Sequence, residues 1–203
     1  MNACMCAVHK NRHGRCHTPP EEDETPKTLR DVLRVYRRVR GPTVEEEERW
    51  WRADGLPFSE VIHRAVTSKL RCGCHHSHQS RIRRRVYAQC ETALLAIQGQ
   101  LTVSQSFDEL FGRVKIAFHR IPGAGEMIVY DVADRIALHL GLDPSRVYLH
   151  RGTRDGAMAL VEGITSRTQY IDVAVLPAPL SKMTPRELET ALCVYKGYFR
   201  QWS

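Results

Sequence analysis

The sequence predicts an all-α, multi-helix protein. Through most of its 203 residues, apolar side chains recur at the spacing of one helical face. Ser, Thr and Pro residues that typically begin helices stand before several of these stretches. Only residues 170–180, YIDVAVLPAPL, have strand-like composition, and their two prolines favour a short extended segment over a sheet.

The first half of the chain divides into a tail and three expected helices. Residues 1–26 lack apolar periodicity and end in a Pro- and acid-rich stretch, so we expect a tail there and a helical domain over 27–203. Thr28 begins the first helix, and Thr43 with Glu46 forms a capping-box pattern for the second. Residues 56–70 predict the third helix.

The second half predicts a long helix over 81–101 and a helical pair over about 107–141. Ser106 and Glu109 form a capping box before the pair. Asp143 and Pro144 predict a short helix, and Thr153 is expected to cap the next one. A last helix is expected to start at residues 184–187.

The charge of the chain favours a polyanionic partner. The formal net charge is +7, and basic residues cluster in residues 27–40 and 81–85. The helix expected over 81–101 begins with arginines, which is unfavourable because positive charge opposes the helix dipole at that end. The arrangement is acceptable if those arginines face the phosphates of a partner. The alternative is that they form an ordinary solvated face of the helix. There is no apolar stretch of membrane-spanning length and no signal-peptide pattern, so we expect a cytoplasmic protein.

Cysteine and histidine cluster in two places that could hold zinc. The chain has seven cysteines, and a disulfide framework is not expected in a cytosolic protein. Thiolates and imidazoles are the ligands that zinc favours, although a C-x-C spacing is tight. Unmetallated thiols beside a His-rich basic loop are the alternative, and Cys90 and Cys193 are expected to pack among apolar residues. The candidate ligands are Cys4, Cys6, Cys16, Cys72, Cys74, His76 and His78.

The stretch RIPGAGEMIVYDVADRIALHLGL, residues 120–142, joins the two helices of the expected pair. One glycine at the end of a helix is common because glycine accepts positive φ. A second glycine where the next helix begins removes side chains from an N-terminus, where exposed amides bind anions. An ordinary αα-hairpin is the alternative.

This stretch resembles the helix-hairpin-helix motif, whose hairpin grips a DNA phosphate without sequence preference. The resemblance implies a mainly duplex DNA partner contacted through phosphates. The basic residues of 81–85 are expected to add affinity because of their charge. It is carried by Ile121 to Gly125. The expected DNA-binding residues are Arg120, Pro122, Gly123, Ala124, Gly125, Arg81, Arg83 and Arg84, with a second contact at Thr153 and Arg154.

The large helix-hairpin-helix relatives are DNA glycosylases, to which the chain is similar only in part. They carry a Lys after the hairpin glycines and an Asp further on, but here the matching places hold Glu126, Met127 and residues 147–150, VYLH. These departures argue against glycosylase chemistry of that kind. The region 76–198 also resembles a group of bacterial proteins without an assigned reaction.

Two other functions stay open at this point. A divergent glycosylase or other nucleobase-acting hydrolase could use a pocket at Tyr148, His150 and Asp155, although a lone histidine is more often structural. An adaptor could instead bind a protein partner through its acidic and basic segments.

Overall fold

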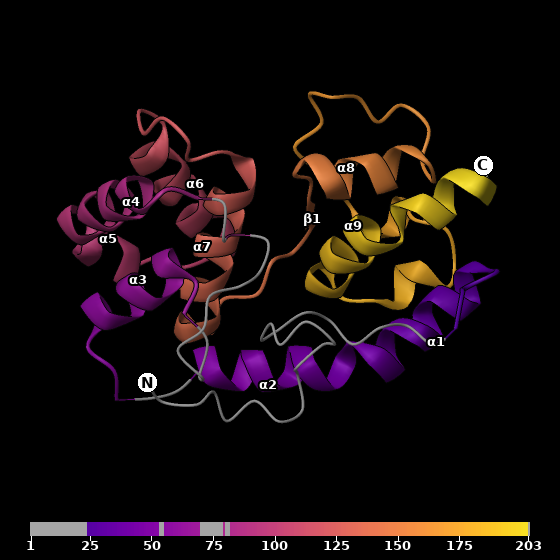
Figure 1. The fold of residues 1–203 in the computed structure, drawn as a ribbon, viewed down its shortest axis with the longest axis horizontal. Coiled ribbons are helices and arrows are strands. Elements are labelled where there is room, and N and C mark those ends of the chain that lie inside the picture. The colour runs from indigo at the N-terminus through magenta and orange to yellow at the C-terminus, as the bar shows by residue number, and fades with distance from the viewer. Residues whose placement is uncertain (1–23, 53–54, 70–78, 80–81, 203) are drawn as a thin grey trace. The chain divides into compact units, whose positions relative to one another are not determined.

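The computed structural model describes residues 24–52, 55–69, 79 and 82–202, and these residues are mostly helical (Figure 1). The all-α prediction is therefore confirmed at the level of fold class. Two compact units form: the described residues within 43–143 make unit 1, and residues 24–42 with 144–202 make unit 2. Unit 2 is thus assembled from two segments of the chain, one before and one after residues 43–143. Of the expected tail, residues 1–23 lie outside the described residues.

Unit 1 is built around α7, which packs against α3 and α6, while α4 packs against the same two helices. Most residues of α7 are buried, and Val132, Ala133 and Ile136 are fully inaccessible. This burial explains why α7 carries apolar residues on more than one face. The helices are α2 (Gly41–Trp51, beginning in unit 2), α3 (Phe58–Thr67), α4 (Arg84–Ala96), α5 (Gln98–Thr102), α6 (Phe107–Phe118) and α7 (Glu126–Leu140).

Unit 2 surrounds the long C-terminal helix α9, which buries Leu188, Leu192 and Phe199 in one apolar core. Two short strands pair antiparallel beside it, with Val147 opposite Ile171. Helix α1 packs on α9 and on η3. The elements are α1 (Leu29–Val39), β1 (Val147–Tyr148), α8 (Arg151–Met158), β2 (Tyr170–Ile171), η2 (Val173–Val175), η3 (Leu180–Lys182) and α9 (Pro185–Trp202).

Helices α8 and α9 approach each other at two glycines. A Cβ atom on Gly156 would lie 2.1 Å from the Leu192 carbonyl oxygen, and one on Gly152 would lie 2.6 Å from Cys193 Sγ. The two glycines are four residues apart, so they lie on the same face of α8. The α8 backbone therefore rests directly on α9.

The predicted start of three helices is confirmed by hydrogen bonds. Thr28 Oγ1 accepts from Asp31 N at 3.1 Å, and Ser106 Oγ accepts from Glu109 N at 3.2 Å. Thr184 Oγ1 accepts from the amide of Glu187 at 3.2 Å, and the Glu187 carboxylate accepts from the amide of Thr184 at 2.8 Å. These bonds satisfy amides that a helix leaves without internal partners.

Two other predicted boundaries are wrong. The second helix begins at Gly41 and contains Thr43, because α1 ends at Val39 and the chain enters α2 almost directly, with Pro42 in the first turn, where no amide is needed. The expected helix over 81–101 is two helices, separated at Ile97, whose φ of −116° and ψ of 15° are not helical.

The region after residue 141 also differs from the prediction. Asp143 and Pro144 begin no helix, because the chain runs on to pair Val147 and Tyr148 with the second strand. Helix α8 begins at Arg151 with His150 at its N-cap, so Thr153 lies inside the helix and does not cap it. The extended segment expected in 170–180 is confirmed only at Tyr170 and Ile171.

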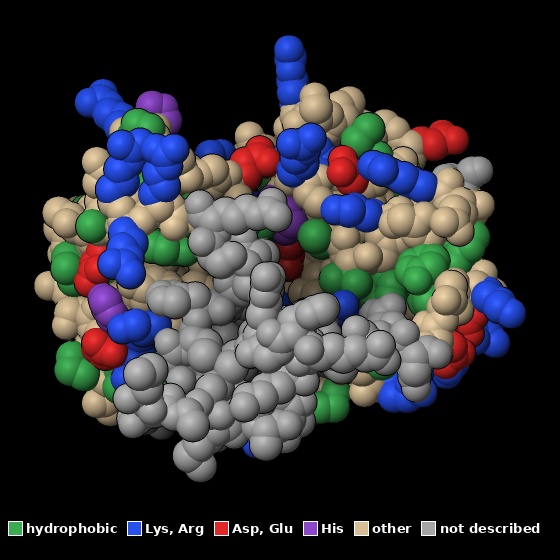
Figure 2. All heavy atoms as spheres, in the orientation of Figure 1, with side chains coloured by type: hydrophobic (Ala, Val, Ile, Leu, Met, Phe, Trp, Pro, Cys, Tyr) green, Lys and Arg blue, Asp and Glu red, His purple; other side chains and the backbone are tan. Residues whose placement is uncertain are grey.

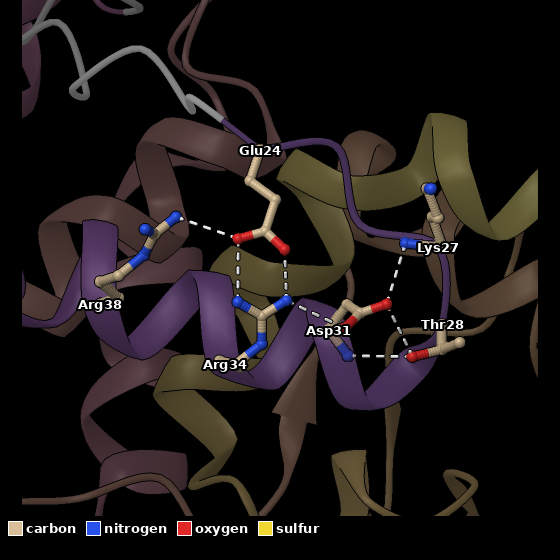
Figure 3. A network of polar contacts seen from close by, with 6 residues as sticks. All are labelled: Glu24, Lys27, Thr28, Asp31, Arg34 and Arg38. Carbon is tan, nitrogen blue, oxygen red and sulfur yellow. Dashed lines mark hydrogen bonds and ion pairs between the residues drawn. The ribbon is translucent and has the colours of Figure 1, made fainter.

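Part of the basic run 27–40 is neutralised within unit 2 (Figure 3). Arg34 donates to both oxygens of Glu24 and to Asp31, and Arg38 donates to Glu24 at 3.3 Å. The hydrogen bonds from Arg34 hold the pKa of the Glu24 and Asp31 carboxyl groups below their ordinary values. These two arginines are therefore paired with carboxylates of their own unit.

None of the described helices combines the length and the apolar composition that a membrane crossing needs.

Replacing Gly156 by alanine is expected to destabilise unit 2. The new methyl group would meet the Leu192 carbonyl, and separating α8 from α9 costs about 1–3 kcal/mol, as overpacking typically does. Urea unfolding followed by circular dichroism measures the change. Gly197→Ala is the matched control: its Cβ meets nothing within 4 Å, so the free energy of unfolding should rise by about 0.5–1 kcal/mol. Equal effects of the two substitutions would contradict the close approach.

Candidate nucleic-acid interface

Helices α6 and α7 are joined by residues 119–125, which reverse the chain through short hydrogen-bonded turns. The amide of Ile121 donates to the Phe118 carbonyl at 2.9 Å, and that of Ala124 donates to the Ile121 carbonyl at 3.1 Å. Gly123 has a φ of +97°, which side chains rarely adopt. The reversal therefore needs a glycine at position 123.

Gly123 also fixes where the hairpin lies. A Cβ atom at this position would be 3.1 Å from Cγ2 of Val86, a buried residue in the first turn of α4. The contact joins two segments that are distant in the sequence. It places the α6–α7 hairpin against the beginning of α4.

The beginning of α4 is strongly basic. Arg83 is the N-cap, Arg84 and Arg85 follow it, and all three side chains are exposed. Within the described residues no carboxylate pairs with them, and the first turn of α4 contains no acid. Positive charge at a helix N-terminus opposes the helix dipole. Arg81, the other predicted arginine of this run, lies outside the described residues.

The end of α6 and the two residues after it add further basic side chains beside the hairpin. Lys115, His119 and Arg120 are exposed and border a shallow hollow of about 680 Å³. Ile116, which is 78% exposed, and Gly112 also line it. In Figure 2, Lys, Arg and His side chains gather over the part of unit 1 where Figure 1 draws α4 and α6. We call the following set the hairpin surface: Arg83, Arg84, Arg85, Lys115, His119, Arg120 and the backbone of residues 122–125.

Gly125 is the N-cap of α7, and no side chain among the described residues caps this helix. Its φ of −79° suits any residue, and a Cβ on it would meet nothing within 4 Å. Neither conformation nor packing therefore requires a glycine here. The position leaves the amides of the first turn of α7 approachable, although Glu126 adds a negative charge beside them.

The structure thus brings together most of the predicted phosphate contacts. Arg83 and Arg84 lie beside the hairpin, and the exposed Arg120 precedes Pro122. Ala124 is half-buried and contributes its amide to the turn. Sequence reasoning missed Lys115, His119 and Val86. The first two could have been found as basic residues one helical turn apart, but nothing in the sequence pairs Val86 with Gly123.

The second predicted contact, at Thr153 and Arg154, belongs to unit 2 and is buried. Thr153 is inaccessible, and Arg154 is only 8% exposed. The Arg154 guanidinium donates to the Leu149 carbonyl at 2.6 Å and to the Thr168 carbonyl at 2.9 Å. These bonds hold the chain around β1 and the loop before β2, so we leave both residues out of the hairpin surface.

The residues of the alternative hydrolase site are engaged within unit 2. Tyr148 is buried beside the ring of Tyr170, and Asp155 pairs with Arg200 at 3.5 Å. His150 Nε2 contacts the Glu189 carboxylate and lies 2.9 Å from Thr153 Oγ1. Glu189 is 39 residues from His150 in the sequence, and no local sequence pattern predicts their contact.

The predicted zinc ligands, Cys4, Cys6, Cys16, Cys72, Cys74, His76 and His78, all lie outside the described residues. Within the described ranges, no group of three or more His, Cys, Asp or Glu side chains is placed to hold a metal ion. Gln79, next to the His-rich stretch, is fully buried and bonded to Asp131 of α7.

No protein-family model, curated protein or solved structure gives a significant match to this chain.

The two hairpin glycines are expected to respond oppositely to substitution. Gly123→Ala should lower the free energy of unfolding by about 1–2 kcal/mol, because its φ is unfavourable for a side chain and Val86 leaves little room. Gly125→Ser should be neutral or stabilising by a few tenths of a kcal/mol, because Ser is a better N-cap than Gly. Chemical denaturation of both variants tests this. A Gly125→Ser variant as unstable as Gly123→Ala would contradict the open space at residue 125.

Proposed function

We propose that the protein binds duplex DNA through its phosphates, using the hairpin surface. One observation carries the proposal: the contact between Gly123 and Val86 places the glycine-capped N-terminus of α7 beside the exposed arginines that begin α4. The resemblance of residues 120–142 to the helix-hairpin-helix motif supports the same function.

The two parts of the surface offer different phosphate contacts. Amides at the start of α7 can donate to phosphate oxygens, and the positive end of the helix dipole favours their charge. Arginine guanidinium groups add bidentate hydrogen bonds and release condensed counterions from the duplex. The unfavourable position of Arg83 and Arg84 for α4 itself is compensated when a phosphate lies against them.

The composition of the surface favours binding without sequence preference. Backbone amides and guanidinium groups that contact phosphates position a protein on DNA but do not read its bases. We therefore expect similar affinity for duplexes of unrelated sequence.

Removing two arginines should weaken binding and its salt dependence together. In the Arg83→Gln/Arg84→Gln variant, the slope of log K against log salt should become less steep by about 0.9 for each phosphate that the protein no longer neutralises. Fluorescence anisotropy of a labelled random-sequence duplex, titrated at several salt concentrations, measures both quantities. The Arg167→Gln/Lys182→Gln variant is the matched control, because it removes the same charge from exposed positions in unit 2.

Two results would contradict the proposal. The first is an affinity for the duplex that does not change with salt. The second is an equal loss of affinity in the variant of unit 1 and in the control of unit 2.

Gly125→Ser tests the amides of α7 directly, because its hydroxyl would accept hydrogen bonds from those amides and compete with phosphate. We expect weaker DNA binding from a protein that is at least as stable. If Gly125→Ser and Gly125→Leu both bind DNA as tightly as the wild-type protein, the amides at the start of α7 do not contact phosphate.

Glu126 is expected to oppose binding. Its carboxylate lies in the first turn of α7, where it would repel an approaching phosphate. Glu126→Gln should therefore tighten duplex binding by about two- to fivefold at low salt, since such an interaction is worth about 0.3–1 kcal/mol. The same anisotropy titration measures the change, with Glu162→Gln, an exposed acid of unit 2, as the control. Weaker binding by Glu126→Gln would show that no phosphate lies at the first turn of α7.

A further inference from the structure

A thiol, an imidazole and an ammonium group converge beside Gly152 in unit 2. Cys193 Sγ, His150 Cε1 and Lys196 Nζ lie 2.6, 3.5 and 3.5 Å from the position that a Cβ on Gly152 would occupy. Cys193 Sγ can pack against α8 here only because residue 152 has no side chain. Cys193 is a partly accessible residue.

The packing of α8 on α9 explains this convergence. Glu189, Cys193 and Lys196 follow the i, i+4, i+7 spacing, so they lie on one face of α9. Gly156 allows that face to approach α8. His150 is the N-cap of α8, and its Nε2 atom contacts Glu189.

The surroundings of the sulfur favour its negatively charged form. The Lys196 ammonium group is a neighbouring positive charge. Gly152 is the second residue of α8, so the sulfur also lies at the positive end of that helix. Neighbouring Lys or His side chains and helix N-termini are the features that convert cysteines into thiolates.

The nearby carboxylates are engaged with other groups. Glu189 contacts His150 and accepts from Thr153 Oγ1 at 3.1 Å, and Asp155 pairs with Arg200. These pairings reduce the effect of the two negative charges on the sulfur. Lys196 and the positive end of α8 are the features that we expect to stabilise the thiolate.

We propose that Cys193 is a nucleophilic cysteine and a modification site for small uncharged electrophiles. The thiolate sulfur attacks an electrophilic carbon, the new C–S bond forms as the bond to the leaving group breaks, and the leaving group departs with the electron pair. Cys90 is the contrasting thiol of the same chain: it is fully buried in α4, and burial raises its pKa to about 12.

Iodoacetamide labelling of the folded, full-length protein tests the proposal. The thiolate displaces iodide, and peptide mass spectrometry follows Cys193 and Cys90 separately. We expect the rate at Cys193 to reach half its maximum below the ordinary cysteine pKa of about 8.5, and Cys90 to remain unlabelled until the protein unfolds. A rate at Cys193 no faster than that of a free cysteine peptide at neutral pH would overturn the proposal.

A matched pair of variants identifies the source of the reactivity. Lys196→Gln should slow labelling of Cys193 at neutral pH about tenfold, the change in thiolate fraction that one pKa unit produces. Lys196→Arg should retain the rate, and Lys182→Gln, at an exposed position of the same unit, should not change it. Equal rates in wild type and a folded Lys196→Gln variant would overturn the assignment to Lys196. If that variant does not fold, the pH profile of the wild-type protein decides.

Discussion

Each unit depends on a glycine at which a neighbouring helix leaves little or no room for a side chain. In unit 2, Gly156 faces the Leu192 carbonyl, so the α8 and α9 backbones touch and the side chains around them close into one core. In unit 1, Gly123 faces Val86, which sets the hairpin against α4. Both contacts are possible only because glycine has no side chain. In unit 2 the close packing of α8 on α9 positions Cys193, and in unit 1 the contact positions the arginines of α4 beside the hairpin.

The two basic runs of the chain have different electrostatic environments. Arg34 and Arg38 are paired with carboxylates of unit 2, so their charge is used within the fold. Arg83 and Arg84 have no such partner among the described residues and lie at the helix end where positive charge is least favourable. Charge that a fold does not use for its own stability is available to a partner. Under the proposed function, this difference favours the hairpin surface over the paired arginines of α1.

Local signals in the sequence predicted local structure well. The caps at Thr28, Ser106 and Thr184 depend on residues three positions apart, and all three are confirmed. The Thr43 pattern was wrong because the preceding helix leads directly into α2. Contacts between distant residues, such as Gly123 with Val86 and His150 with Glu189, have no sequence signature. The burial of Arg154 follows from carbonyls that only the folded chain brings to it.

The path of the chain has a consequence for the order in which the units form. Helix α1 packs on η3 and α9, which are synthesised only after residues 43–143 of unit 1. The described residues of unit 1 lie in one stretch of the chain, 43–143, so they have one another as packing partners before the C-terminal residues leave the ribosome, whereas α1 has to wait for α9. During synthesis, the apolar face of α1 therefore lacks α9 until the last helix has formed, and a chain truncated before α9 would leave that part of the face without its packing partner.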